Sequence, residues 1–232
     1  MGYRLLLVLT VAGVTVVAGG GAAQAAPSPV ASWEMNEKSG AGVMSDRSGH
    51  GLDGRVGKEV RTGASKAGAM AYRFLKVTDP PVHPEHLVTV ADRAALDPGV
   101  RDYTVTFRMS TTHTGANIIQ KGQAGAAGGY FKLENVKGAA RCLFKGPRGG
   151  VHIATGRRFD DGAWHIVECA RTSNAVTLTV DGAVVARRSG RTGDISNASP
   201  LSIAGKINCG GPAKITCDYY AGYLDWVRIK AR

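Results

Sequence analysis

The stretch "AVTLTVDGAVVAR" (175–187) is the clearest indication of the fold of this chain. Asp181-Gly182 is a two-residue turn signal of the type I′ kind, and it lies between two runs in which apolar and polar residues alternate. This pattern predicts a β-hairpin with one apolar face in the core and the threonines Thr177 and Thr179 on a wetter face. The expected pairs are Val180 with Ala183, Leu178 with Val185, and Val176 with Arg187.

The same kind of pattern continues along the chain, and helical periodicity is nearly absent. Short runs rich in β-branched and aromatic residues are separated by Gly, Asp, Asn and Pro, and the 32 glycines suit many turns. We expect an all-β fold, a two-sheet antiparallel β-sandwich or jelly roll, in one domain. The expected strands are 30–35, 69–76, 86–91, 102–110, 116–121, 129–135, 139–145, 151–155, 164–171, 175–180, 183–188, 200–206 and 218–230.

The first 25 residues have the features of a secretory signal peptide. Arg4 precedes the uncharged apolar run 5–19, and Ala23-Gln24-Ala25 is a small-x-small cleavage pattern. Glycines 19–21 end the apolar run before it reaches the roughly 20 residues of a spanning helix. We therefore expect residues 26–232 to form the mature domain, secreted and without membrane insertion after cleavage.

The formal net charge is +11, with 29 Lys and Arg against 18 Asp and Glu. Such a surface suits an acidic partner, for example an anionic polysaccharide or another acidic cell-surface polymer. The basic residues are scattered, with nothing longer than pairs such as Arg157-Arg158. This scatter favours a solvated basic surface over specific binding of nucleic acid.

Four cysteines in an exported chain indicate disulfide bonds. Cys209 and Cys217 bracket a short loop that contains Gly and Pro, so we expect them to pair locally. Cys142 and Cys169, both in strand-like runs, then form the second bridge. Zinc is disfavoured because there is no C-x-x-C pair and no cysteine with histidine at ligand spacing.

Four stretches together resemble one family, the laminin G-like (concanavalin A-like) jelly roll in its secreted bacterial form. They are "VASWEMNEKSG…SDRSGHGLDG" (30–54), "LDPGVRDYTVTFRMST" (96–111), "DGAWHIVECARTSNAVTLTVDGAVV" (161–185) and "CDYYAGYLDWVRI" (217–229). The resemblance implies a β-sandwich and places Trp33 and Trp164 in its framework. The fold hosts many functions, so the ligand does not follow from it.

We expect a non-catalytic secreted binding module for carbohydrate or a cell-surface polymer. A protein–protein adhesion module is the alternative, because laminin G-like domains also serve in that role. A polysaccharide-cleaving enzyme ranks third, since a retaining glycosidase needs two carboxylates about 5 Å apart and no strand offers them at alternating positions. A Gly-x-Ser-x-Gly elbow is also absent from the sequence.

The segment "SDRSGHGLDG" (45–54) contains the residue types of a serine hydrolase and of a cation site. Its glycines indicate a flexible loop and not a rigidly presented nucleophile. Relatives of this kind often carry a structural Ca²⁺, for which we expect Asp46, Glu37 and Asp225 as ligands. The other interpretation is that Asp46 forms an Asx-turn and Asp225 satisfies backbone donors.

Aromatic rings are the usual means of holding a sugar, because they suit its apolar face. Tyr219, Tyr220 and Tyr223 cluster in the sequence beside the Cys209–Cys217 loop. Trp226, which alternates with Leu224, belongs either to the core or to the surface. We expect the three tyrosines and Trp226 to form the ligand-binding surface.

Overall fold

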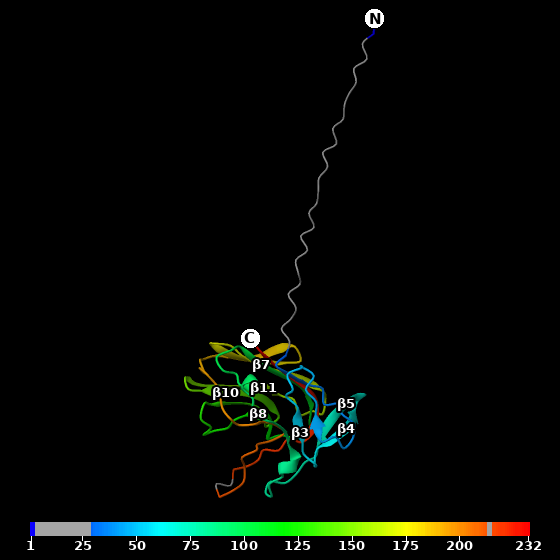
Figure 1. Cartoon of the computed structure of the whole chain (residues 1–232), viewed down its shortest axis with the longest axis vertical. Coiled ribbons are helices and arrows are strands. Elements are labelled where there is room, and N and C mark those ends of the chain that lie inside the picture. The colour runs from blue at the N-terminus through cyan, green and yellow to red at the C-terminus, as the bar shows by residue number, and fades with distance from the viewer. Residues whose placement is uncertain (3–28, 213–214) are drawn as a thin grey trace.

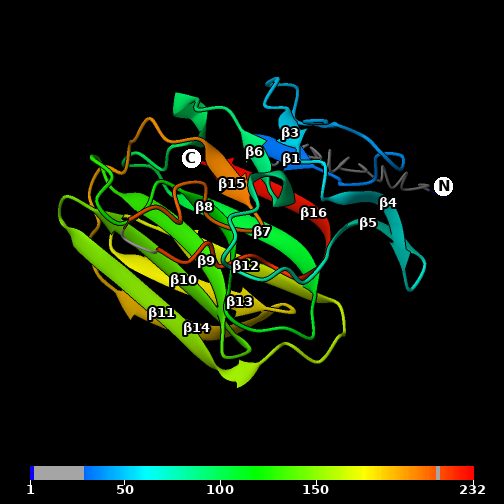
Figure 2. The same ribbon diagram turned by 90° about the horizontal axis from the view of Figure 1, so that it is seen from below.

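The computed structural model describes residues 1–2, 29–212 and 215–232. The described chain forms two antiparallel sheets of eight strands, packed face to face as a β-sandwich (Figures 1 and 2). The expected signal peptide, apart from its first two residues, lies outside the described residues. The fold class expected from the sequence is confirmed.

One sheet, called here the β16 sheet, contains both ends of the domain. β1 pairs with β16, with Ala31 opposite Ile229, so the two ends lie side by side. The remaining strands run in the order β14-β13-β12-β7-β16-β5-β4. Their bounds are β1 Ala31–Trp33, β4 Arg61–Lys66, β5 Ala69–Phe74, β7 Tyr103–Ser110, β12 His165–Arg171, β13 Ala175–Val180, β14 Ala183–Ser189 and β16 Gly222–Ala231.

The other sheet, called here the β8 sheet, runs in the order β11-β10-β9-β8-β15-β6-β3-β2. Its bounds are β2 Val43–Met44, β3 Gly54–Val56, β6 Val88–Val90, β8 Ala116–Lys121, β9 Tyr130–Val136, β10 Ala139–Gly146, β11 Gly149–Arg158 and β15 Leu201–Ile203. Two 3₁₀ turns, Pro84–His86 and Ala94–Leu96, complete the elements of the described residues.

Each of the thirteen expected strands corresponds to an observed strand, and 116–121 and 175–180 have the expected bounds. Sequence analysis missed three strands, β2, β3 and β4. β2 and β3 are two and three residues long, which is too short for an alternating pattern to stand out. β4 reads Arg-Thr-Gly-Ala-Ser-Lys and lacks large apolar residues.

The β13–β14 hairpin turns at Asp181 and Gly182, whose φ values of +50° and +80° are those of a type I′ turn. The expected pair Val180–Ala183 is confirmed. The other two pairs are wrong, since the register shifts and Leu178 opposes Ala186 while Val176 opposes Arg188. The extra residue is a β-bulge in an edge strand, where bulges increase the twist and discourage further pairing.

The core between the sheets is continuous and contains the framework tryptophan Trp33, which is fully buried. Tyr103 of the β16 sheet packs against Phe131 of the β8 sheet with ring centroids 5.4 Å apart, and Phe144 packs on Phe131 at 5.7 Å. The Tyr103 hydroxyl donates a hydrogen bond of 2.8 Å to the Leu96 carbonyl. The core therefore joins the two sheets through interlocking rings as well as aliphatic side chains.

Two disulfides have the pairing expected from the sequence. Cys142 on β10 bonds to Cys169 on β12, with Cα atoms 6.1 Å apart, and this bond joins the two sheets. Cys209 bonds to Cys217 with Cα atoms 5.0 Å apart and closes a loop at the surface.

Removing the bridge between the sheets should cost more stability than removing the local one. Chain-entropy arguments give about 3.5 kcal/mol for the bridge between Cys142 and Cys169, which are separated by 27 residues, and about 2.5 kcal/mol for the pair separated by eight. Urea unfolding of the two double Cys→Ala variants measures both values. The opposite order would contradict the entropic argument.

Candidate functional site

β16 lies between β7 and β5, and its two faces have different roles. Leu224, Val227 and Ile229 are fully buried in the core, whereas Tyr223 and Trp226 are partly exposed on the outer face. The register with β7 shifts between Leu224 and Trp226. This bulge explains why side chains three positions apart point to the same face, since in a regular strand they would point to opposite faces.

Tyr223 is the centre of an aromatic and cationic cluster on the outer face. The Lys66 ammonium lies 5.3 Å from its ring centroid and the Arg73 guanidinium 5.5 Å. The Trp164 ring stands edge-on to Tyr223, with centroids 6.3 Å apart. Trp164 also donates a hydrogen bond of 3.3 Å from its indole nitrogen to the Lys66 carbonyl, which ties the start of β12 to the end of β4.

Both exposed tryptophans are covered by an arginine. Arg108 lies 4.5 Å from the Trp164 ring, and Arg228 lies 4.5 Å from the Trp226 ring. These cation–π contacts hold the rings in place on the sheet. Each arginine also has a carboxylate partner, Asp225 for Arg108 and Glu34, at 3.1 Å, for Arg228.

Two pockets adjoin at Tyr223 and Arg73. The first has a volume of about 240 Å³ and lies between the ends of β5 and β7. The second has a volume of about 560 Å³ and lies over β4 and the segment of Ser39 and Gly40, and this volume is within the roughly 300–1,000 Å³ of small-molecule sites. Because the two pockets adjoin, together they offer room for a ligand that extends across the surface.

The structure separates the aromatic residues that sequence analysis grouped together. Tyr223 and Trp226 lie on the outer face as described, and Tyr219 lies near the disulfide loop, where its hydroxyl accepts a hydrogen bond of 2.6 Å from the His83 amide. Tyr220 is 1% exposed, so its assignment to the binding surface is wrong. Its hydroxyl lies 3.1 Å from both the Ser110 and the Tyr223 carbonyl oxygens, inside the core.

Sequence analysis missed the partners of Tyr223. The resemblance placed Trp164 in the framework of the fold, but its side chain is partly exposed. Lys66 and Arg73 are isolated charges in the sequence and belong to no motif. Lys66 is on β4, Arg73 is on β5 and Trp164 directly precedes β12, and the three meet at Tyr223 because β12, β7, β16, β5 and β4 follow one another in the sheet. The one signal in the sequence was the position of Trp164 at the first residue of the expected strand 164–171, beside a Gly-containing turn.

Asp46 organises the 45–54 loop as an acceptor of hydrogen bonds. One carboxylate oxygen accepts from the amides of Ser32 (3.0 Å) and Ser48 (2.9 Å). The other accepts from the Ser48 hydroxyl (2.7 Å) and the Leu52 amide (3.0 Å). Burial of Asp46 opposes its ionisation, but these hydrogen bonds outweigh that effect and lower the pKa of the carboxyl group below its usual value.

The three residues expected to bind Ca²⁺ do not form a cation site. All four lone-pair positions of Asp46 are occupied by donors, and Glu37 accepts from the Ser45 amide (2.9 Å) and the Tyr72 hydroxyl (2.6 Å). Asp225 is held by Arg108. No three His, Cys, Asp or Glu side chains of the described residues gather where a metal ion could bind. These residues therefore do not fit a calcium ion, and the Asx-turn interpretation describes Asp46.

The same loop lacks the geometry of a serine hydrolase. His50 Nδ1 lies 3.0 Å from the Ser48 hydroxyl, but Asp46 contacts Ser48 and not His50. In a catalytic triad the carboxylate orients the histidine, which in turn activates the serine. The Ser48 hydroxyl oxygen also lies 3.1 Å from the Val30 carbonyl oxygen, so Ser48 holds the loop close to the start of β1.

Among the described residues, no helix has both the length and the apolar character needed to cross a membrane.

Comparison with known proteins identifies relatives in fold. Residues 85–232 match the sequence model of the concanavalin A-like lectin/glucanases superfamily. No curated protein matches the chain.

Solved structures with the same fold include two binding domains and one domain of an arabinanase. The binding domain of Paraclostridial Mosquitocidal Protein 1 aligns with a TM-score of 0.60 and 14% identity over 88% of this chain and 48% of that one. The botulinum neurotoxin serotype D binding domain gives the same values. Domain 4 of AbnA, a GH43 extracellular arabinanase from Geobacillus stearothermophilus, in complex with arabinotriose, aligns with a TM-score of 0.60 and 15% identity over 88% of this chain and 93% of that one. This chain thus spans about half the length of the two binding domains, and at these identities the likeness shows the fold alone.

Asp46→Ala should destabilise the fold by about 2–4 kcal/mol, because it leaves several partly buried donors without an acceptor. The pKa of Asp46 is lowered in the folded state, so its contribution is present above pH 4 and is lost as the pH falls through the folded pKa. The difference between wild type and variant, measured by urea unfolding, should therefore shrink in acid. The control is His50→Ala, a change at an exposed side chain, which should alter the free energy of unfolding little.

A melting temperature that rises with Ca²⁺ in the wild type but not in Asp46→Ala would contradict the exclusion of a cation site.

Proposed function

The chain belongs to the concanavalin A-like lectin/glucanases superfamily, and from that premise we propose that it is a non-catalytic module that binds a carbohydrate or another cell-surface polymer. The observation that carries this proposal is the cluster of Tyr223 with Trp164, Lys66 and Arg73 on the outer face of the β16 sheet. Partly exposed rings offer apolar surface to the C–H faces of a sugar, and the neighbouring nitrogen groups offer donors to its hydroxyl groups.

The position of these side chains supports binding without large rearrangement. Tyr223 and Arg73 belong to neighbouring strands of one sheet and lie directly opposite each other in its register. A site on strands holds its side chains more firmly than a site on loops, so less ordering entropy is lost when a ligand binds.

The lining of the two pockets supports a role without catalysis. A glycoside hydrolase of the usual kind needs two carboxyl groups that flank the scissile bond. The residues that line these two pockets include no Asp or Glu. The nearby Asp225 is engaged by Arg108 in an ion pair.

The relatives in fold offer further support. One of them, domain 4 of AbnA, was solved in complex with arabinotriose, and the other two are binding domains. These relatives therefore associate the sandwich fold with binding roles.

Export is part of the proposal, with residues 1–25 as a signal peptide and 26–232 as the mature domain. The two disulfides support an oxidising environment, because such bonds rarely persist in the cytosol. We expect the protein recovered from the medium of an expressing bacterium to begin at Ala26, as measured by intact mass. A secreted product that still contains Arg4 would contradict the cleavage.

The binding face is tested by a glycan array on the mature protein followed by titration of the best glycan. We expect Tyr223→Ala and Trp164→Ala each to weaken binding about tenfold, which corresponds to about 1.4 kcal/mol. Tyr130→Ala is the matched control, because Tyr130 is a partly exposed tyrosine on β9 of the other sheet.

Circular dichroism must show that each variant is folded. Wild-type protein that binds no glycan on the array would contradict the proposal and leave the protein–protein adhesion module as the better account. An effect of Tyr130→Ala equal to that of Tyr223→Ala would move the site to the other sheet.

A further inference from the structure

The two pockets at Tyr223 are part of a longer groove. A third pocket, with a volume of about 240 Å³, shares Lys76 and His113 with the first and extends to Tyr219. The second pocket shares Arg73 and Tyr223 with the first. The groove therefore runs from the Ser39–Gly40 segment past Tyr223 to Tyr219.

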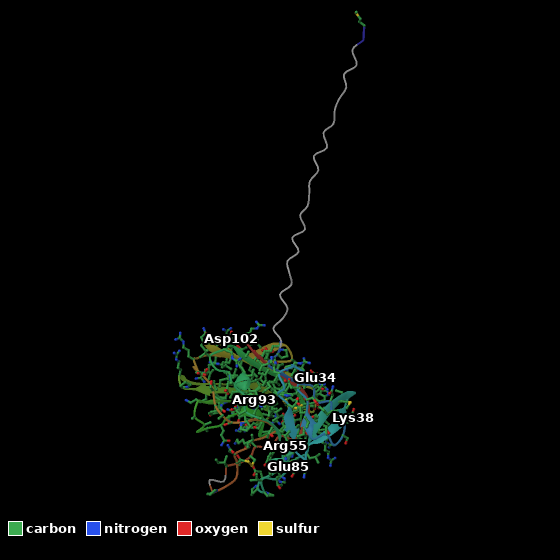
Figure 3. The ribbon with its side chains drawn as sticks, in the orientation of Figure 1. Glu34, Lys38, Arg55, Glu85, Arg93 and Asp102 are labelled. Carbon is green, nitrogen blue, oxygen red and sulfur yellow. A yellow bond between two sulfur atoms is a disulfide. The ribbon has the colours of Figure 1, made fainter. Side chains whose placement is uncertain are left out.

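The groove follows an edge of the molecule. Figure 2 shows the β4–β5 hairpin at one side of the sandwich, beyond the strands of the β8 sheet. The segment before Ser39 is tied to this hairpin, because the Thr62 hydroxyl donates a hydrogen bond of 2.7 Å to the Lys38 carbonyl. Figure 3 labels Lys38 at this edge. The three pockets along it are open to solvent, so an internal segment of a polymer can enter without a free chain end.

Positive charge is concentrated in the half of the groove formed by the first and second pockets. Its lining includes four cations and no carboxylate: Arg61, Lys66, Arg73 and Lys76. Within the described part of the chain, none of the four has a carboxylate oxygen within 4.0 Å of its charged nitrogens. Because the lining contains no acidic side chain, no nearby carboxylate balances the positive charge of these four residues.

The arginines elsewhere on the same face differ in this respect. Arg108 and Arg228, which cover the two tryptophans, are both paired with carboxylates. Their charge is therefore largely balanced within the protein, and they serve to position the rings. The cations of the groove have no such partner, so their charge remains available for a ligand.

The far end of the groove has no comparable excess of positive charge. Lys76, Asp79 and Asp218 line the third pocket. Asp79 accepts a hydrogen bond from the Cys217 amide, and Asp218 is paired with Lys206. An anionic group of a ligand is therefore favoured near Tyr223 over the end at Tyr219.

We propose that the groove binds an internal segment of an acidic polysaccharide, with carboxylate or sulfate groups on Lys66 and Arg73 and a sugar ring against Tyr223. This inference rests on the proposed function and specifies the class of its ligand. A planar guanidinium makes two parallel hydrogen bonds to a carboxylate or sulfate, and the ammonium of Lys66, which also lies beside the Tyr223 ring, adds a second cationic contact.

The test uses oligogalacturonates as probes, with the methyl esters of the same oligomers as neutral counterparts. We expect wild-type protein to bind the acid at least tenfold more tightly than the ester at 0.1 M salt, with an advantage that falls as salt rises. Affinity for the acid should increase with oligomer length beyond the disaccharide, because successive sugars fill adjoining pockets.

The matched variants carry the same change in net charge at opposite edges of the β16 sheet. Lys66→Gln with Arg73→Gln should weaken binding of the acid about tenfold, or about 1.4 kcal/mol, and so remove most of the advantage of the acid over the ester. Arg187→Gln with Arg191→Gln, on and beside β14, should retain wild-type affinity for both. Equal losses in the two double variants would show unspecific attraction to a basic protein and overturn the inference.

Other outcomes separate this inference from the proposed function. Equal affinity for acid and ester, with loss of both in Tyr223→Ala, would overturn the acidic ligand while the carbohydrate-binding module stands. Affinity that is already maximal at the disaccharide would overturn the extended groove. Tighter binding of a single-stranded oligonucleotide than of any oligogalacturonate would assign the groove to nucleic acid, because surfaces of aromatic and cationic side chains also bind single strands.

Discussion

The burial of one face of β16 is the constraint on which the rest of the arrangement depends. Leu224, Val227 and Ile229 have no exposed surface, and a strand cannot bury both faces when only one sheet lies opposite. The bulge at Asp225 then decides that Tyr223 and Trp226 share the outer face. Because β16 pairs with β1, β5 and β7, the same strand holds together the ends of the domain and the candidate site.

The opening loop illustrates how reactive residue types serve a structural role. Asp46 and Ser48 are engaged with the backbone of β1 and of their own loop, and Trp33 donates a hydrogen bond of 2.8 Å to the Leu52 carbonyl beneath them. A carboxylate that satisfies four donors in a partly buried place has no oxygen left for a cation. Its negative charge is nevertheless useful, because hydrogen bonds to an ionised group are stronger than neutral ones.

Charge on the outer face of the β16 sheet is divided between two uses. Near the tryptophans each arginine has both an aromatic ring and a carboxylate as neighbours, which fixes its position. Beside Tyr223 the cations have a ring but no carboxylate. The total charge of +11 therefore says less about binding than the local pairing does, since the field of a paired charge is largely cancelled by its partner beyond the ion pair.

The sandwich, most of its strands, the Asp181-Gly182 turn and the Cys209–Cys217 bridge follow from the sequence because they are local features. Alternation, turn residues and the spacing of Cys209 and Cys217 are visible within a few positions. The bridge between Cys142 and Cys169, 27 residues apart, was expected only because the other two cysteines pair with each other. Only the tertiary structure decided that Tyr220 is core, that Trp164 is partly exposed and that Lys66 and Arg73 meet at Tyr223. The physical reason is that strands adjacent in this sheet are far apart in the chain, as β7, β16 and β5 are. A side chain's neighbours across such strands depend on register and bulges, which long-range packing sets and local pattern does not.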